Sequence, residues 1–522
     1  MAAKYKTPGV YINEQNALPN SVAPVATAIP AFVGYTPVTD YRGKSNLNLP
    51  VKVNSWDEFV KIFCYPIVAG QMQRNYHPHF SIRLSKGRND TRGFVFIDQV
   101  HYKISPDPST IYYLYLSVYL FYQNGGGEAY IVSVGGYGKP SGKTLEAGDP
   151  LVNPNVSLTD LLKGLHVLKK ETEPTLYVVP EATLLPLQEN AILTQEMLKQ
   201  CQQLKTAISI LDVPAGSFPG QASFEKEVEN FRKSKGSIGL SYGAAYIPFL
   251  QTIALPTEEV NYTNLFGGDL SKLAELINPG RKDETLAKFF DMITEKEVTD
   301  LTVNQLNSAL KNRSKLYAAL ITSVRDMANL LPPSGAIAGL ITAVDSMHGV
   351  WKAPANVSLS GVIGLPFHLT SDQQAPLTMD ATTGKSINGI RSFPGKGILV
   401  WGARTLDGNN QEFKYISVRR TVIFIEQSCK LAMRAIVFEP NVLTTWNTIS
   451  ATIGNFLTSL WREGGLAGAK SEQAFYVACG LGKTMTAQDI LDGKLVISIG
   501  VAITRPAEFT VITLKQQMST DS

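Results

Sequence analysis

Between residues 112 and 252 the chain alternates between helix-like and strand-like segments. Helical patterns occur in "YYLYLSVYLFYQ", "LTDLLKGLHVLKK" and "LQENAILTQEMLKQCQQL". Apolar runs typical of buried strands occur in "EAYIVSV", "TLYVVPE", "TAISILDVP" and "GAAYIPFLQ", and earlier in "VATAIPAFVGYT" (25–36). Strands that alternate with helices of this length predict a largely parallel sheet with helices on its faces.

At 522 residues the chain is too long for one ordinary core, so we expect several domains. We predict a multidomain fold that combines α/β and α+β parts. The expected parts are an N-terminal segment (1–20), an α/β domain (21–365), an α+β domain (366–505) and a C-terminal segment (506–522). Two insertions interrupt the α/β domain. Residues 67–110 are polar and expected to be irregular, whereas residues 256–330 have a helical pattern.

The α+β domain is expected to contain two amphipathic helices, over about 416–436 and from about 441 to 464. Apolar residues at helical spacing predict the buried side of each helix. In the first helix they are Val418, Val422, Ile425, Cys429, Met433 and Ile436. In the second they are Val442, Trp446, Ile449, Ile453, Phe456 and Leu460. The charged residues of the first helix are expected on its surface: Arg419, Glu426, Lys430 and Arg434. Two strands, "AFYVACG" and "KLVISIGVAIT", should close the domain.

The composition is that of an ordinary globular protein, with 44% hydrophobic and 18% charged residues. A formal net charge of +4 is small for this length and predicts no nucleic-acid partner. The first residues, "MAAKYKTPGVYINE", carry a proline and a glycine where a secretory signal would be apolar. Apolar stretches such as "GAIAGLITAV" are about half as long as a membrane span. We therefore expect a soluble chain, made in the cytoplasm, that does not insert into a membrane.

The cysteines and histidines give no pattern typical of a metal or catalytic site. The four cysteines lie far apart without a CxxC pair, which favours reduced, buried thiols: Cys64, Cys201, Cys429 and Cys479. His77 and His79 could bind a metal in principle, but no cysteine or second histidine pair lies near them in sequence. No Ser–His–acid arrangement can be assembled from six scattered histidines. We expect no metal, no cofactor and no catalytic residues.

One segment, "CGLGKTMT" (479–486), partly resembles the phosphate-binding loop of an NTPase. Such a loop needs a glycine five residues before its Gly–Lys pair, but Val477 occupies that position. It should also open a long helix, whereas only "AQDILD" fits before Gly493. An ordinary turn is the better interpretation, and an NTPase that uses Gly482, Lys483 and Thr484 is the alternative. The glycines of "NGGGEAYIV" follow a helix and precede a strand, which favours a helix C-cap.

Both ends of the chain carry strand-like segments. In "RPAEFTVITLKQQ" (505–517), Phe509, Val511 and Thr513 fall on one side of an extended chain. Thr510, Ile512 and Leu514 fall on the other. The short alternation "GVYINE" near the start cannot form a stable strand alone. Such a strand can join a sheet of its own chain or add to the edge of a neighbour's sheet. The spacing leaves both possibilities open and slightly favours the first.

Several segments together resemble the contractile tail sheath proteins of phages and of phage-tail-like injection systems. They are "YKTPGVYINE", "VATAIPAFVGYT", "YQNGGGEAYIV", "PPSGAIAGLITAVDSMHGVWKAPAN", "GKGILVWGARTL", "YISVRRTVIFIEQSCKLAMRAIVFEPN" and "RPAEFTVITLKQQ". The resemblance implies that subunits stack as rings, sixfold in the family, around an inner tube. It also implies that terminal arms join sheets of neighbouring copies. The N-terminal arm would use Tyr5, Pro8, Gly9, Val10, Tyr11, Ile12 and Glu14, and the C-terminal arm Pro506, Glu508, Phe509, Val511, Ile512 and Leu514.

The resemblance further implies a mechanical role. The sheath would contract from a metastable extended state and drive its tube into a target envelope, as part of a phage tail or of an injection particle that a cell can release. Baseplate and terminator proteins would be further partners. Lys430 and Arg434 are our candidates for the contact with the tube, and the two insertions would face outward. A soluble monomeric scaffold or adhesin is a further alternative.

Overall fold

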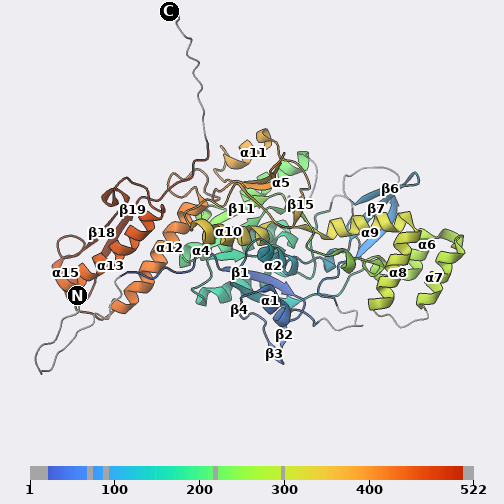
Figure 1. The fold of residues 1–522 in the computed structure, drawn as a ribbon, viewed down its shortest axis with the longest axis horizontal. Coiled ribbons are helices and arrows are strands. Elements are labelled where there is room, and N and C mark those ends of the chain that lie inside the picture. Colours follow the sequence, from blue (N-terminus) through green and yellow to red (C-terminus); the bar gives the residue numbers. More distant parts are fainter. Residues whose placement is uncertain are drawn as a thin grey trace, which may run out of the picture. The chain divides into compact units, whose positions relative to one another are not determined.

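The computed structural model describes residues 21–66, 74–85, 93–146, 149–214, 221–294 and 300–509 (Figure 1). The chain forms two compact units. The larger unit comprises residues 26–423 and 505–522, and the smaller comprises residues 1–25 and 424–504.

The larger unit is built on a nine-stranded sheet with the order β14-β17-β16-β11-β10-β9-β1-β8-β4. Its strands are β1 (Pro30–Thr36), β4 (Val51–Val53), β8 (Ala129–Gly136), β9 (Leu176–Val178), β10 (Ile208–Asp212), β11 (Gly243–Ile247), β14 (Val357–Ser358), β16 (Asn388–Phe393) and β17 (Gly397–Trp401). The strands from β16 to β8 in this order run parallel, and β4, β17 and β14 pair antiparallel at the two sides. The prediction of a largely parallel sheet is confirmed.

Successive residues of a strand point to opposite faces of the sheet, and every residue of β1 is buried. Helices therefore cover both faces of this sheet. Phe32 of β1 packs edge-to-face on Phe121 of α2 (Leu114–Gln123). The next residue, Val33, lies against α3 (Leu158–Val167), where a side chain at Gly164 would collide with it. The helix α4 (Leu187–Leu204) packs on α3, and α10 (Ser334–His348) packs on α2. The core strands are therefore buried on both sides, as their apolar runs predict.

The apolar segment "SGAIAGLITAV" forms the helix α10, which is buried against α2. A Cβ atom at Gly335 would lie 2.3 Å from the carbonyl oxygen of Ser117, and one at Gly339 would lie 2.3 Å from that of Phe121. Only glycine allows this close approach of two helix backbones. The segment is apolar because it crosses the interior of the protein.

Helix ends follow the predicted signals with one difference. At α1 (Trp56–Phe63), the Ser55 hydroxyl accepts a hydrogen bond from the N–H of Glu58, as a capping box predicts. The Glu58 carboxylate, however, accepts from the N–H of Asn54 and not from that of Ser55. After α2, Gly125 adopts a φ of +91° and the N–H of Gly126 donates to Phe121, so the predicted glycine C-cap is confirmed.

The prediction that the first insertion (67–110) is irregular is wrong. Much of its described part forms a three-stranded antiparallel sheet. The strands are β5 (Phe80–Ser85), β6 (Phe94–Ile97) and β7 (Val100–Pro106), in the order β5-β7-β6. The hairpin between β6 and β7 turns at Asp98 and Gln99, both with positive φ. Such tight turns are usually signalled by Asn–Gly or Asp–Gly, whereas this turn is formed by Asp98 and Gln99.

The second insertion is helical as predicted, with α6 (Leu270–Ile277), α7 (Glu284–Thr294), α8 (Asp300–Arg313) and α9 (Lys315–Ala328). It contacts the first insertion: α9 packs on β6 and β7, and the side chain of Asn264 donates to the carbonyl of Pro78 at 2.9 Å. The two insertions, far apart in sequence, therefore form one lobe of the larger unit (Figure 1).

The larger unit also contains shorter elements around the sheet. They are β2 (Asp40–Tyr41), β3 (Lys44–Ser45), α5 (Gln221–Ser234), β12 (Leu250–Thr252), β13 (Leu330–Leu331), β15 (Val362–Gly364) and α11 (Ser371–Thr378). The strands β16 and β17 follow residue 366 and still belong to the main sheet. The expected boundary at 366 therefore does not coincide with the edge of the sheet.

The smaller unit contains most of the expected C-terminal elements. The helix α12 (Ile416–Met433) begins in the larger unit and ends in the smaller one. The other elements are α13 (Leu443–Arg462), α14 (Ser471–Ala474), β18 (Phe475–Cys479), α15 (Ala487–Leu491) and β19 (Ile497–Val501).

All four cysteines of the chain are free and buried, as expected.

Candidate assembly site

The strands β18 and β19 form a two-stranded antiparallel sheet that packs on α13. Its register runs from Phe475 opposite Val501 to Cys479 opposite Ile497. Among the residues that the structure describes, no third strand joins this sheet. A two-stranded sheet is marginal by itself, and its outer edges carry backbone groups that can pair with a further strand.

The side of α13 that was predicted to be buried supports this sheet. Ile449 and Ile453 are fully buried, and Trp446 packs in a small core with Cys479 and Met485. Val442 is an exception, since it lies at the N-cap of α13 and is exposed.

On α12, most of the predicted apolar stripe is buried, but Arg419 is not on the surface as predicted. Its guanidinium lies 3.4 Å from the centre of the Phe413 ring and donates a hydrogen bond to Ser241 at 2.9 Å. An arginine can be buried where an aromatic ring and a hydroxyl receive its guanidinium. The helix is therefore buried over a wider arc than its apolar residues indicate.

The tube-contact candidates Lys430 and Arg434 are both exposed, as expected for a surface role. Lys430 lies in the last turn of α12 and Arg434 begins the following 3₁₀ turn (Arg434–Ile436). Phe438, just beyond, is fully exposed and has a φ of +77°. The end of α12 thus presents cationic and apolar side chains together.

The N-terminal arm candidates, residues 5–14, lie outside the described residues. The chain just after them is held by side chains of α12. Within the smaller unit, the N–H of Val25 donates to the hydroxyl of Ser428 at 3.1 Å. Within the larger unit, Arg420 donates to the carbonyl of Thr27 at 2.9 Å. Both contacts hold described residues that follow the N-terminal segment in sequence.

Arg420 is oriented by a buried ion pair. Its guanidinium makes two hydrogen bonds to the carboxylate of Asp345 on α10, at 2.8 and 2.5 Å. Only 3% of the Arg420 side chain and 5% of the Asp345 side chain are exposed. This parallel, two-bond geometry is the strongest form of an Arg–carboxylate contact. It joins α12, α10 and the chain near Thr27.

At the other end, the C-terminal arm candidates Val511, Ile512 and Leu514 lie outside the described residues. Pro506, Glu508 and Phe509 are described, and Glu508 is bound to its own chain. Its carboxylate accepts from Arg404 at 2.6–3.0 Å and from the hydroxyl of Tyr415 at 3.1 Å. We call Arg404, Tyr415 and Glu508 the C-terminal clamp.

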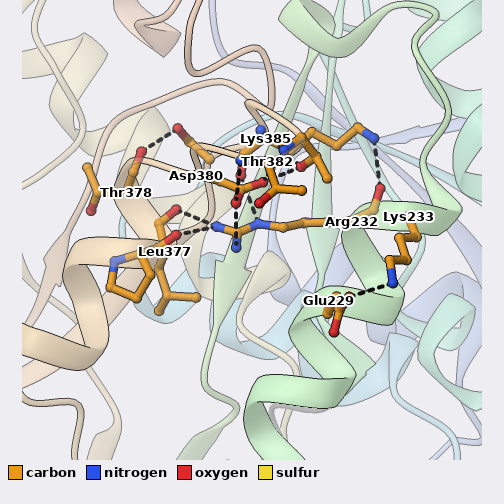
Figure 2. A network of polar contacts seen from close by, with 11 residues as sticks. Glu229, Arg232, Lys233, Leu377, Thr378, Asp380, Thr382 and Lys385 are labelled. Carbon is orange, nitrogen blue, oxygen red and sulfur yellow. Dashed lines mark hydrogen bonds and ion pairs between the residues drawn. The ribbon is translucent and has the colours of Figure 1, made fainter.

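The clamp is supported from two sides. The side chain of Asn388 on β16 receives the N–H of Arg404 and donates to its carbonyl, both at 2.8 Å. Arg404 also donates to the carbonyl of Thr378 at 3.3 Å. Thr378 ends α11, and Figure 2 shows how α5 holds the chain around it: Arg232 donates to the carbonyl of Leu377 at 3.1 Å and to that of Lys385 at 2.9 Å. The buried position of Arg404 therefore rests on a fixed backbone.

The segment "CGLGKTMT" forms a closed turn and not a phosphate-binding loop. The N–H groups of Lys483 and Thr484 donate to the carbonyl of Gly480 at 3.2 and 3.0 Å, and that of Gly482 donates to Met485. A phosphate-binding loop would direct such N–H groups at the anion. The helix that follows, α15, has five residues. The turn connects β18 to α15, as the ordinary-turn interpretation predicts.

We expect that Lys483→Ala will leave the rate of phosphate release from ATP unchanged, at the level of a buffer blank. The N–H groups of this turn are already used by its own carbonyls, so Lys483 has no phosphate to neutralise. A colorimetric phosphate assay on the wild type and the variant checks this. A wild-type rate above the blank that Lys483→Ala removes would instead support the NTPase alternative.

Two buried acids at the ends of core strands, Asp212 and Glu181, have structural partners. Asp212 ends β10 and accepts hydrogen bonds from the N–H and the hydroxyl of Ser334, at 2.8 and 2.6 Å, at the start of α10. Glu181, just after β9, accepts from the N–H groups of Tyr113 and Leu114 at the start of α2. Burial raises the pKa of each carboxyl to about 7. Both acids thus cap buried helices.

His77 and His79 lie with ring centres 5.1 Å apart, and the ring of His77 has protein partners on both nitrogens. Nε2 lies 3.3 Å from the carbonyl of Thr263, and Nδ1 lies 3.2 Å from the side-chain nitrogen of Asn264. Burial, followed by the charges of His79 and Arg74, lowers the pKa of His77 to about 3. Within the described ranges, no group of three or more His, Cys, Asp or Glu residues could hold a metal ion.

None of the helices in the described part of the chain combines the length and the apolar character needed to cross a membrane.

Comparison with known sequences connects the C-terminal part to one family. Residues 408–517 match the phage tail sheath C-terminal domain. A tail sheath protein of Vibrio phage KVP40 is 26% identical over 136 residues, which are 26% of this chain and 20% of that protein. The matched region therefore spans about a fifth of the phage protein.

Comparison with solved structures extends over the whole chain. The sheath of the PVC extracellular contractile injection system in its contracted state has a TM-score of 0.59 and 24% identity, covering 99% of both chains. The contracted helical sheath of the anti-feeding prophage has a TM-score of 0.57 and 24% identity, covering 98% of this chain and 100% of that chain. The chain shares the fold of these sheath proteins, including the predicted mixture of α/β and α+β parts.

Proposed function

We propose, from the premise that the chain belongs to the contractile tail sheath family, that it is the structural subunit of a sheath that surrounds an inner tube. The proposal rests most on one observation: the two-stranded sheet of β18 and β19 falls within the matched sheath domain, and no further described strand joins it. Such a sheet is suited to accept strands from other copies.

In this proposal the terminal arms supply those strands. Residues 5–14 of one copy, and the residues that follow Glu508 up to about 515, would pair with β18 and β19 of neighbouring copies. Pro506 and Glu508, predicted as part of this arm, would instead form its root, because Glu508 is bound within its own chain. An arm of about eight residues gains roughly 0.2–1 kcal/mol per cross-strand pair, so one arm alone binds weakly. Two arms per copy, repeated through a closed lattice, hold each copy at several points and make detachment cooperative.

Contraction would then be a transition from a metastable extended lattice to one with more contact between copies. The arms keep copies connected while the folded units rotate. Free energy stored during assembly would drive the change, so we propose no nucleotide hydrolysis and no other enzymatic activity.

The proposed partners are other copies in stacked rings of six, the inner tube, a baseplate and terminator proteins. Lys430 and Arg434 would contact the tube. A charged contact suits a tube that must be released, since water can replace it at small cost. The lobe built from the two insertions would face outward. The particle would assemble in the cytoplasm, as a phage tail or as an injection particle that can be released.

Electron microscopy of the purified chain, alone and with its tube protein, tests this function. We expect long hollow cylinders from the full chain. Removal of residues 510–522, or of residues 1–20, should leave folded monomers and no cylinders, because a copy without an arm cannot complete its neighbour's sheet.

The matched control removes only residues 518–522, which lie beyond the region that matches the sheath domain, and should leave assembly unchanged. A full chain that stays monomeric with its tube, or arm truncations that leave the oligomeric state unchanged, would favour a monomeric scaffold or adhesin.

A further inference from the structure

The C-terminal clamp is placed where the chain passes from one unit to the other. The smaller unit ends at Thr504 and the larger unit resumes at Arg505. Arg505 donates to the carbonyl of Gln411 at 2.9 Å, and Glu508 is bound by Arg404 and Tyr415. The segment 505–508 therefore returns to the larger unit, although the β18–β19 sheet just before it belongs to the smaller unit.

The exposure of the side chains rises sharply just after the clamp. The Arg404 side chain is only 6% exposed and the Glu508 side chain 21% exposed, whereas the next residue, Phe509, is 66% exposed. Burial, and next the charge of Glu508, raises the pKa of Tyr415, which keeps its hydroxyl a hydrogen-bond donor. Glu508 is thus the last residue of the C-terminal segment with a described hold on the folded chain, and the arm can leave from this point.

Arg404 connects the clamp to two parallel strands of the main sheet, β16 and β11. Asn388 of β16 holds its backbone on both sides and also donates to the carbonyl of Ala245 on β11, at 3.1 Å. The N–H of Leu406, two residues on, donates to the carbonyl of Gly243 on the same strand at 2.8 Å. A pull on Glu508 would therefore reach parallel strands in the body of the larger unit.

We infer that Arg404 and Tyr415 are positioning residues that fix the root of the C-terminal arm to the larger unit, so that the arm transmits motion of the α/β body to the neighbour it joins. The inference rests on the proposed function and adds the mechanical connection. Without the clamp, the arm would be held on the larger unit only by the hydrogen bond of Arg505 to Gln411, and rotation of the larger unit would pull on it less directly.

Glu508→Gln tests the clamp, because it removes the charge and keeps the size of the side chain. In limited proteolysis of the unassembled chain, chymotrypsin should cleave after Phe509 at least tenfold faster, because residues 505–509 are no longer held on the larger unit. The concentration needed for cylinder assembly should rise at least tenfold, since the arm is no longer preordered. Glu508→Asp keeps the charge, so both measurements should lie closer to the wild-type values than in Glu508→Gln.

The matched control is Glu229→Gln, which removes an exposed ion pair with Lys233 on α5 (Figure 2) and should change neither measurement. Unchanged cleavage and assembly in Glu508→Gln would overturn the inference. So would new cleavage sites within β11 and β16, because Glu508 would then hold the fold and not the arm. A wild type that never forms cylinders would contradict the proposed function, while the cleavage measurement would still decide the clamp.

Discussion

Asp345→Ala should lower the free energy of unfolding by about 3–5 kcal/mol. The variant leaves the guanidinium of Arg420 buried without its carboxylate, and a buried charge without a partner is costly. The remaining described acceptor of Arg420, the carbonyl of Thr27, cannot replace two charge-assisted hydrogen bonds. The same loss should loosen the contact of α12 with α10.

Urea denaturation of the unassembled chain, followed by circular dichroism, measures this effect. Asp345→Asn keeps the shape of the side chain and should lose most of the same stability, since the charge is what it removes. Asp291→Ala is the control, because its ion pair with Arg281 is more than half exposed and should contribute under about 1 kcal/mol. Equal urea midpoints for Asp345→Ala and Asp291→Ala would contradict the prediction.

The parallel sheet could be predicted from the sequence because burial on both faces leaves a direct mark, a continuous apolar run. "AFVGYT" and "ISILD" became β1 and β10 for this reason. The hairpin of β6 and β7 left no such mark. Its strands are partly exposed, with Phe96 on the surface, and Asp98 and Gln99 adopt positive φ without a glycine. Strand propensity depends on how the side chains pack, so it is a weak guide for partly exposed strands that lack a regular apolar pattern.

The contacts around the arms could not be predicted, because their partners are distant in sequence. Arg404 and Glu508 are 104 positions apart, and Arg420 and Asp345 are 75 apart. Spacing carries no information about such pairs. One signal was present: Arg404 follows the apolar strand "ILVW", and Arg419 and Arg420 interrupt the apolar first half of α12. Arginines in apolar surroundings indicate buried partners, which the surface assignment of Arg419 overlooked.

The two strand-end acids should make stability depend on pH. Burial raises the pKa of Glu181 and of Asp212 to about 7, above the values near 4 expected in the unfolded chain. Between these values the folded state binds more protons than the unfolded state, so each acid loses its stabilising contribution as pH rises from about 4 to 7. The contribution is complete below pH 4 and absent above pH 7, and its size is on the order of 3–4 kcal/mol per group.

Glu181→Gln and Asp212→Asn remove one titrating group each and nearly keep its shape. Relative to wild type, each variant should therefore gain about 3 kcal/mol of stability between pH 4 and pH 7.5, with no further change above. Urea midpoints measured across this range give the difference at each pH, which cancels the titration of every other group. Glu229→Gln, with a side chain 61% exposed, should differ little from wild type at every pH. A flat difference for Glu181→Gln would mean that the N–H groups at the start of α2 already stabilise its carboxylate as well as water does.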